Sequence, residues 1–251
     1  ACRPGCYGVA LPEALGWIKK AGIEHAEVPF AADGDYAGLA KQAEQAGITI
    51  SSLAGGVKLD NAASVATLEQ AIAGASQIGT RIIFLSAGVE QAASEEGLDP
   101  LRDLAEKAHA AGVVLSIETH VPYGHNAETA IRTFKAVNSP GLGHNFDTAN
   151  IYYYNPKGID GIEELKQVLP YVASVHLKES ARGEPKEADF PVLGTGIVDF
   201  PAVFRLLGER GFTGPYTLEL EGPLVKDLPV EERHDKVTAC VAYLREIGAM
   251  D

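Results

Sequence analysis

Four side chains that commonly bind divalent metals recur along the chain. They are Glu118, Asp147, His176 and Glu219, separated by 29, 29 and 43 residues. Three carboxylates and one imidazole suit a hard or borderline divalent cation such as Mn²⁺, Mg²⁺ or Co²⁺. Without a cation, three carboxylates held together would repel one another and raise each other's pKa values. If the fold brings these residues together, we expect one divalent-metal site.

Other polar residues flank these four positions. Glu221 competes with Glu219, because the two share a face of the same predicted strand. Lys178 shares a strand face with His176, and Arg182 follows in a segment rich in Gly and charge. Lys178 and Arg182 are therefore expected to hold substrate oxygens or a phosphate. Three more residues either line the site or pack beside it: Glu27, His120 and His125.

The elements that must position these residues alternate regularly. Short apolar runs predict strands, and longer segments, several of them Ala-rich, predict helices. The predicted strands are residues 7–11, 25–30, 48–53, 81–86, 113–118, 142–147, 173–178 and 215–220. The predicted helices are residues 12–21, 36–46, 62–78, 98–111, 127–137, 161–169, 200–210 and 230–247. Each candidate ligand then lies in or just after one of four consecutive strands.

Eight strand–helix units leave two architectures, an open doubly wound sheet or a closed barrel. The chain has 251 residues, an ordinary length for an eight-fold barrel, and no Gly-x-Gly-x-x-Gly follows its first predicted strand. We therefore predict an α/β fold, a single (β/α)₈ TIM barrel, with residues 1–251 forming one domain. Strand C-terminal ends meet at one face of such a barrel, so the four residues would converge there.

Composition limits the classes of partner. The formal net charge of −13 argues against nucleic acid, whose binding rests on many Lys and Arg contacts to phosphates. No apolar run approaches the roughly 20 residues that span a bilayer, so we expect no membrane partner. Three sparse cysteines do not form a disulfide framework, which suits reduced thiols and a cytoplasmic location.

At these residues the chain resembles the sugar phosphate isomerase/epimerase superfamily, the xylose-isomerase-like barrels. The resemblance covers essentially the whole chain and is strongest from Glu118 to Glu219. The matching segments include Phe-Asp-Thr-Ala-Asn at 146–150, Val-His-Leu-Lys at 175–178 and Gly-Thr-Gly-Ile-Val-Asp-Phe at 194–200. It looks most like the branch that contains ketose 3-epimerases, hydroxypyruvate isomerase and inositol-pathway enzymes.

The resemblance implies a role for each matching residue. Glu118, Asp147, His176 and Glu219 would bind one divalent metal, usually Mn²⁺ in that branch. Glu118 and Glu219 would also be catalytic and move protons on opposite faces of the substrate. Arg182, six residues after His176, matches an arginine that binds substrate oxygens. Asn150 stands where the 3-epimerases carry a histidine, and it joins Lys178, Arg182 and His120 as a predicted substrate-binding residue.

The predicted function is a divalent-metal-dependent isomerase or epimerase of a small sugar, hydroxy-ketone or keto-polyol, acting through an enediolate. The enzyme is expected to be a homo-oligomer, either a dimer or a tetramer. The first alternative is a dehydratase or lyase acting on a keto-sugar or keto-inositol. An endonuclease IV-like phosphodiesterase is disfavoured by the acidic charge. A non-catalytic sugar-binding barrel is disfavoured by the two intact glutamates.

Overall fold

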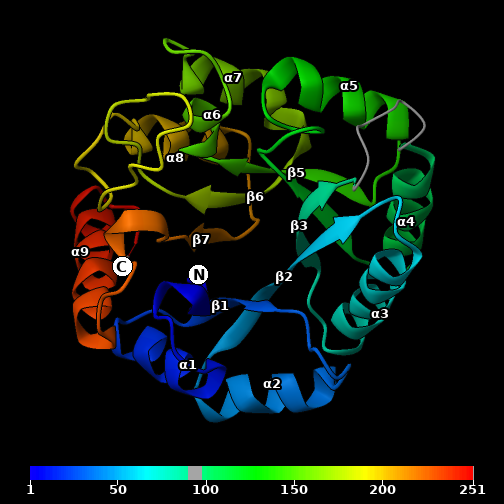
Figure 1. Cartoon of the computed structure of the whole chain (residues 1–251), viewed down its shortest axis with the longest axis horizontal. Coiled ribbons are helices and arrows are strands. Elements are labelled where there is room, and N and C mark those ends of the chain that lie inside the picture. The colour runs from blue at the N-terminus through cyan, green and yellow to red at the C-terminus, as the bar shows by residue number, and fades with distance from the viewer. Residues whose placement is uncertain (90–97, 251) are drawn as a thin grey trace.

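The computed structural model describes residues 1–89 and 98–250. Its seven-stranded sheet runs in the order β1 to β7, and every neighbouring pair is parallel. The strands curve into a barrel, and the helices form a ring outside it (Figure 1). The strands are β1 (His25–Pro29), β2 (Thr49–Lys58), β3 (Ile82–Gly88), β4 (Val114–Glu118), β5 (Leu142–Asp147), β6 (Val172–Leu177) and β7 (Tyr216–Leu218).

The helices alternate with the strands as the apolar pattern predicts. They are α1 (Leu11–Lys20), α2 (Tyr36–Gln45), α3 (Ala62–Gln77), α4 (Leu98–Ala110), α5 (Ala127–Val137), α6 (Asn150–Tyr153), α7 (Gly161–Val168), α8 (Phe200–Glu209) and α9 (Val230–Glu246). Single turns of 3₁₀ helix are formed by η1 (Pro4–Cys6), η3 (Leu169–Tyr171) and η4 (Gly222–Leu224). The predicted TIM-barrel fold is confirmed in this strand–helix order.

The first predicted strand, residues 7–11, is wrong. Tyr7 closes the η1 turn, Gly8 has φ of +66°, and Leu11 already begins α1. Instead, Cys2 bridges the two edge strands, pairing with Ala26 of β1 and with Leu218 of β7. Residues 1–3 therefore stand in the gap between β1 and β7, and Pro4, which has no N–H to donate, ends this extended segment.

Helix ends follow simple local rules. Gly22 and Gly47 follow α1 and α2 with φ of +79° and +67°, a left-handed conformation that glycine adopts without steric cost. At the start of α8, the Asp199 side chain caps the helix by accepting a hydrogen bond from the Ala202 N–H. The two glycine turns return the chain from α1 to β1 and from α2 to β2.

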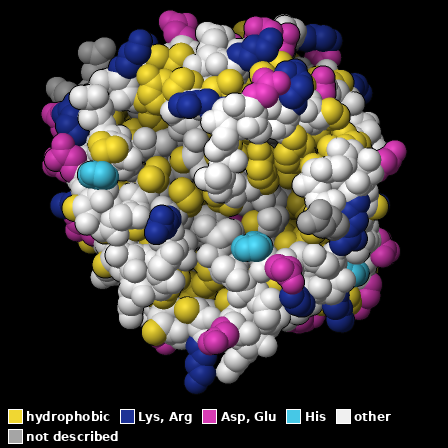
Figure 2. Space-filling model, turned by 180° about the vertical axis from the view of Figure 1, so that it is seen from behind, with side chains coloured by type: hydrophobic (Ala, Val, Ile, Leu, Met, Phe, Trp, Pro, Cys, Tyr) yellow, Lys and Arg dark blue, Asp and Glu magenta, His cyan; other side chains and the backbone are white. Residues whose placement is uncertain are grey.

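The two ends of the barrel differ. Long segments follow β5 and β6 at the C-terminal end of the strands, and the chain after Leu177 has no regular element before Phe200. Figure 2 shows the opposite face of the molecule from the one seen in Figure 1, with hydrophobic side chains around a hollow. In the described part of the chain, no helix is long and apolar enough to cross a membrane.

Candidate metal centre

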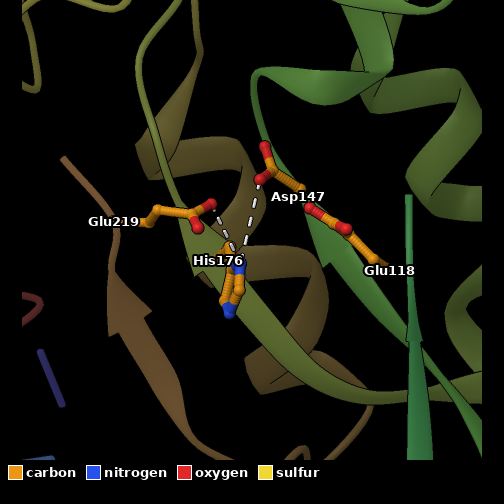
Figure 3. A group of neighbouring side chains, drawn as sticks. All are labelled: Glu118, Asp147, His176 and Glu219. Atoms are coloured by element: carbon orange, nitrogen blue, oxygen red, sulfur yellow. Dashed lines mark hydrogen bonds and ion pairs between the residues drawn. The ribbon is translucent and has the colours of Figure 1, made fainter. Parts of the chain in front are cut away.

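The structure brings the four predicted ligands together. One potential ligand atom from each of Glu118, Asp147, His176 and Glu219 lies within 4.8 Å of the others, and all four residues are buried. Glu118 and Asp147 end β4 and β5, His176 lies on β6, and Glu219 directly follows β7. Figure 3 shows the four side chains pointing toward one another from these strands. Their proximity comes from the barrel, because no two are near in sequence.

The alternation of side chains along a strand explains why these four point inward. Two residues before each of them lies another small or medium polar residue, and these are Ser116, Asn145, Ser174 and Thr217. All four of these residues are fully buried. The Ser174 hydroxyl lies 2.7 Å from that of Ser116 and accepts a hydrogen bond from Asn145 Nδ2 at 2.8 Å. Residues two apart share a face, so this polar layer and the cluster above it line the same interior.

The Asp147 carboxylate is fixed in one orientation. Its Oδ1 accepts hydrogen bonds from the N–H groups of Ala149 and Asn150, at 2.9 and 2.8 Å. Its Oδ2 is buried and accepts no hydrogen bond, although Lys178 Nζ lies 3.0 Å away and His176 Nδ1 3.8 Å away. A buried carboxylate oxygen without a hydrogen bond is costly unless a cation compensates it.

His176 is held from both sides of its ring. Its Nε2 lies 2.9 Å from Glu27 Oε1, and its Nδ1 lies 3.1 Å from Glu219 Oε2. The ring also stacks on Phe84, with centroids 4.4 Å apart. A carboxylate on one ring nitrogen fixes the tautomer that leaves the other nitrogen as a ligand. Nδ1 is therefore the atom that faces the cluster.

Glu27 belongs to this support although it lies on β1, across the barrel. It also accepts a hydrogen bond from Ser52 Oγ at 2.9 Å, and Arg3 Nε lies 3.4 Å from its Oε1. Burial alone would raise the pKa of Glu27, but the nearby His176, Arg3 and Ser52 lower it. Glu27 is thus a charged support for His176 rather than a peripheral residue.

Lys178 places an ammonium inside the cluster. Its Nζ, almost inaccessible to solvent, lies 3.0 Å from Asp147 Oδ2, 2.9 Å from Glu219 Oε2 and 2.8 Å from Glu221 Oε1. Burial would lower the pKa of this lysine, but Asp147 and Glu221 raise it. Lys178 therefore remains cationic and offsets part of the negative charge here.

Glu118 has a neutral hydrogen-bond partner. Asn150 Nδ2 donates to Glu118 Oε1 at 3.0 Å, which ties the first residue of α6 to the end of β4. Burial first, and then the charge on Asp147, raise the pKa of Glu118. Asn150 thus lies beside Glu118, where an amide can also reach a bound ligand.

Glu219 and Glu221 have different surroundings. Glu219 is buried and contacts His176, Lys178 and the Arg3 guanidinium. Glu221 is about half exposed and contacts Lys178. Of the two glutamates after β7, Glu219 is thus the one in the cluster, while Glu221 lies at the edge of the cluster.

A pocket of about 600 Å³ opens above the cluster. Two of the predicted substrate-binding residues, His120 and Asn150, line it, and Lys178 lies beneath it in contact with Glu219 and Glu221. Its other side chains include Arg3, Phe84, Tyr153, Tyr154 and Phe190. Such a mixture of a few polar groups and aromatic walls is typical of small-molecule sites.

Two residues that the sequence suggested for the site, Arg182 and His125, do not line this pocket. The Arg182 guanidinium is exposed, with Nη2 2.7 Å from Glu187 Oε2 and 3.5 Å from Asp189 Oδ2, and it does not line the pocket. The backbone carbonyl of His125 accepts a hydrogen bond from Asn155 Nδ2 at 2.5 Å, and His125 does not line the pocket either. Substrate binding by Arg182 stays a prediction.

Arg3 was not anticipated from the sequence. It belongs to the segment that replaces the first predicted strand, and its guanidinium lies over Phe84, 5.0 Å from the ring centroid. Sequence spacing gave no signal for it, because a single arginine before Pro4 matches no motif. Its position follows only from closure of the barrel between β1 and β7.

The residues present fit a divalent cation. The donor set is one imidazole nitrogen and three carboxylates, with Asp147 Oδ2 buried and free of hydrogen bonds and His176 Nε2 held by Glu27. This set suits Mn²⁺, Mg²⁺, Co²⁺ or Zn²⁺.

Comparison with known proteins identifies a family for this chain. Residues 15–247 match the family model described as a xylose isomerase-like TIM barrel. L-ribulose-5-phosphate 3-epimerase from Escherichia coli O157:H7 is 28% identical over 172 residues, which cover 65% of this chain and 58% of that protein. Inosose dehydratase from Serratia proteamaculans is 28% identical over 137 residues, covering 49% of this chain and 46% of that protein.

The fold also matches solved structures. An IOLI protein with a bound zinc atom superposes with a TM-score of 0.78 at 20% identity, covering 100% of this chain and 98% of that one. The two curated relatives share with this chain only about half of their own length, so their activities are not transferred by similarity alone.

Proposed function

Because the chain belongs to the xylose isomerase-like TIM barrel family, we propose that it is a metal-dependent isomerase or epimerase of a small sugar or hydroxy-ketone. The observation that carries the proposal is the buried group of Glu118, Asp147, His176 and Glu219. The match over residues 15–247 also supports the proposal that residues 1–251 form one barrel domain.

The four residues would hold one divalent ion, Mn²⁺ before Mg²⁺, Co²⁺ or Zn²⁺. When bound, such an ion acts as a Lewis acid that polarises a substrate carbonyl and fixes its orientation. Asp147 would serve as a ligand only, because its Oδ1 is committed to two backbone N–H groups. His176 would bind through Nδ1, with its other nitrogen held by Glu27.

Glu118 and Glu219 would also move protons. Glu118 ends β4 and Glu219 directly follows β7, and two strands, β5 and β6, lie between β4 and β7, so a substrate between the two glutamates is flanked on two sides. One carboxylate would remove the proton from the carbon next to the carbonyl, and the other would return a proton to the opposite face. Asn150 orients Glu118, while Arg3 and His176 orient Glu219.

The test is solvent isotope incorporation. A panel of ketoses and keto-polyols is incubated with the Mn²⁺-loaded protein in D₂O, and products are examined by NMR. We expect an isomer that carries deuterium at the carbon whose configuration changes. Glu118→Gln and Glu219→Gln should each abolish this incorporation, because an amide cannot act as a base.

Glu163→Gln, on the surface of α7 away from the pocket, is the matched control and should exchange normally. An isomer formed without solvent deuterium would contradict proton transfer through these glutamates and would indicate an internal hydride shift. Exchange that survives in both glutamate variants would contradict the assignment of the two bases.

The alternative reaction is elimination of water. The similarity to inosose dehydratase favours it, and the same carboxylates could remove the first proton. The two reactions separate by product, since a lyase yields an unsaturated or deoxygenated compound and an epimerase yields an isomer of the same mass. Mass spectrometry of the product in the same assay decides between them.

A further inference from the structure

The pocket above the cluster has aromatic walls. Phe84, Tyr153, Tyr154 and Phe190 line it together with His120, whose ring meets that of Tyr154 with centroids 4.4 Å apart. Tyr153 in turn meets Tyr154 edge-on at 4.8 Å and Phe190 at 6.1 Å. Aromatic faces stack against apolar C–H surfaces, and Tyr hydroxyls add hydrogen bonds, so these walls suit a polyhydroxylated ring or chain.

The cations at this site are already neutralised. Lys178 Nζ contacts Asp147, Glu219 and Glu221, and the Arg3 guanidinium contacts Glu219 and lies near Glu27. With Glu118, five carboxylates face these two cations. A divalent ion in the cluster would still leave about one net negative charge, so the site does not attract a dianion.

Groups around the rim extend this acidic character. Arg182, the cation predicted to bind substrate, is held by Glu187 and Asp189. Lys157 is likewise paired with Glu184.

Two further lysines lie on segments near the strand C-terminal ends. Lys58 ends β2, and the Lys186 N–H donates to the Tyr153 carbonyl at 3.0 Å. Neither of them lines the pocket, in which the charged residues are Arg3, Glu118, Glu219 and Glu221 among the described part of the chain.

From the aromatic walls and the acidic balance, we infer that the substrate is an uncharged polyhydroxy carbonyl compound and not a phosphate ester. The inference rests on the proposed function and narrows its substrate class. It separates this chain from the L-ribulose-5-phosphate 3-epimerase that it resembles in sequence. A phosphate dianion would meet uncompensated carboxylates, whereas hydroxyl groups can bond to Glu221, Asn150 and the tyrosines.

The experiment compares matched pairs that differ only in the phosphate. The probes are L-ribulose with L-ribulose 5-phosphate, D-xylulose with D-xylulose 5-phosphate, and D-fructose with D-fructose 6-phosphate. Exchange in D₂O gives kcat/KM for each member with the Mn²⁺-loaded protein. In any pair that is turned over, we expect the free sugar to be preferred by about tenfold or more, which corresponds to about 1.4 kcal/mol.

A binding measurement makes this test independent of turnover. Saturation-transfer NMR reports contact between each probe and the protein even without reaction. Preference for the phosphorylated member of a pair, in exchange or in binding, overturns the inference and leaves the proposed function intact. Failure of every probe to exchange counts against the proposed function, and preferential binding of free sugars then still supports the inference. Equal or undetectable binding of both members also overturns it.

A variant that removes one charge tests whether the pocket itself sets the preference for the free sugar over its phosphate. Glu221→Gln removes one carboxylate from the pocket edge and should narrow the preference for the free sugar by several-fold. Glu163→Gln makes the same change of charge on α7 and should leave the ratio unchanged. An equal effect of both variants would show that net charge, rather than the pocket, sets the preference, and would overturn the inference.

Discussion

Two histidines of nearly equal burial lie on neighbouring strands but face opposite sides of the barrel wall. His144 on β5 is 2% exposed and His176 on β6 is 0% exposed. His144 faces the helices and meets Phe134 of α5 edge-on, with centroids 5.7 Å apart. His176 faces the interior and contacts Glu27 and Glu219. The difference between them lies in their partners and not in their depth.

The partners of His144 are neutral. Its Nδ1 lies 3.1 Å from the Ile117 carbonyl and its Nε2 3.3 Å from the Thr119 hydroxyl. Burial lowers the pKa of His144 to about 4, so it stays uncharged near neutral pH. His176, by contrast, lies among carboxylates that also surround an ammonium. A buried histidine is therefore a site candidate only where charged or ligand-type groups converge on it.

The largest expected effect separates these two histidines. His176→Gln removes a metal ligand, so Mn²⁺ affinity should fall by more than about a hundredfold and turnover by more than about a thousandfold. Titration followed by electron paramagnetic resonance measures the first quantity. His144→Gln is the matched control and should keep wild-type Mn²⁺ affinity. Equal losses in both variants would contradict a metal-binding role that belongs to His176 and not to His144.

Glu27, which contacts His176 Nε2, should have the next largest effect on Mn²⁺ affinity. Glu27→Gln removes the carboxylate charge beside His176 Nε2, and this loss should weaken Mn²⁺ binding by between about tenfold and about a hundredfold. Glu24→Gln, an exposed change of the same charge just before β1, should have no effect. Unchanged affinity in Glu27→Gln would show that His176 needs no fixed tautomer, and isothermal titration calorimetry can measure both variants.

His144 should affect stability through pH. Its pKa is lower in the folded protein, about 4, than the usual 6.5, so the unfolded chain binds the extra proton as pH falls through this window. Stability is thus lost as pH falls. The advantage of wild type over His144→Gln in free energy of unfolding should shrink by about 2 kcal/mol between pH 7 and pH 4.5. Urea unfolding at both pH values tests this, and a constant difference would refute it.

Much of this arrangement was readable from the sequence. Short apolar runs predicted seven of the eight strand positions correctly, and ligand-type residues at the ends of four of these strands predicted that the four candidate ligands converge. The partners Glu27 and Arg3 were harder to find. Glu27 is one acid within a strand, and Arg3 reaches the site because the N-terminal segment closes the barrel. Contacts between distant elements are set by closure and leave no local pattern.

The smallest effect concerns Arg182. The sequence resemblance predicts substrate binding, whereas its exposed ion pairs with Glu187 and Asp189 indicate a surface role. From the structure we expect Arg182→Ala to change turnover by less than about twofold and to leave the melting temperature unchanged. Loss of turnover at normal metal content would instead support the substrate-binding prediction and would require this loop to move toward the pocket.

The central claim is that four side chains from β4 to β7 share one divalent ion. Diffraction from crystals soaked in Mn²⁺, measured at the manganese absorption edge, locates the ion directly. We expect a single strong anomalous peak within bonding distance of Glu118, Asp147 Oδ2, His176 Nδ1 and Glu219. A peak at other residues, or the same peak retained in Asp147→Ala combined with His176→Ala, would contradict it.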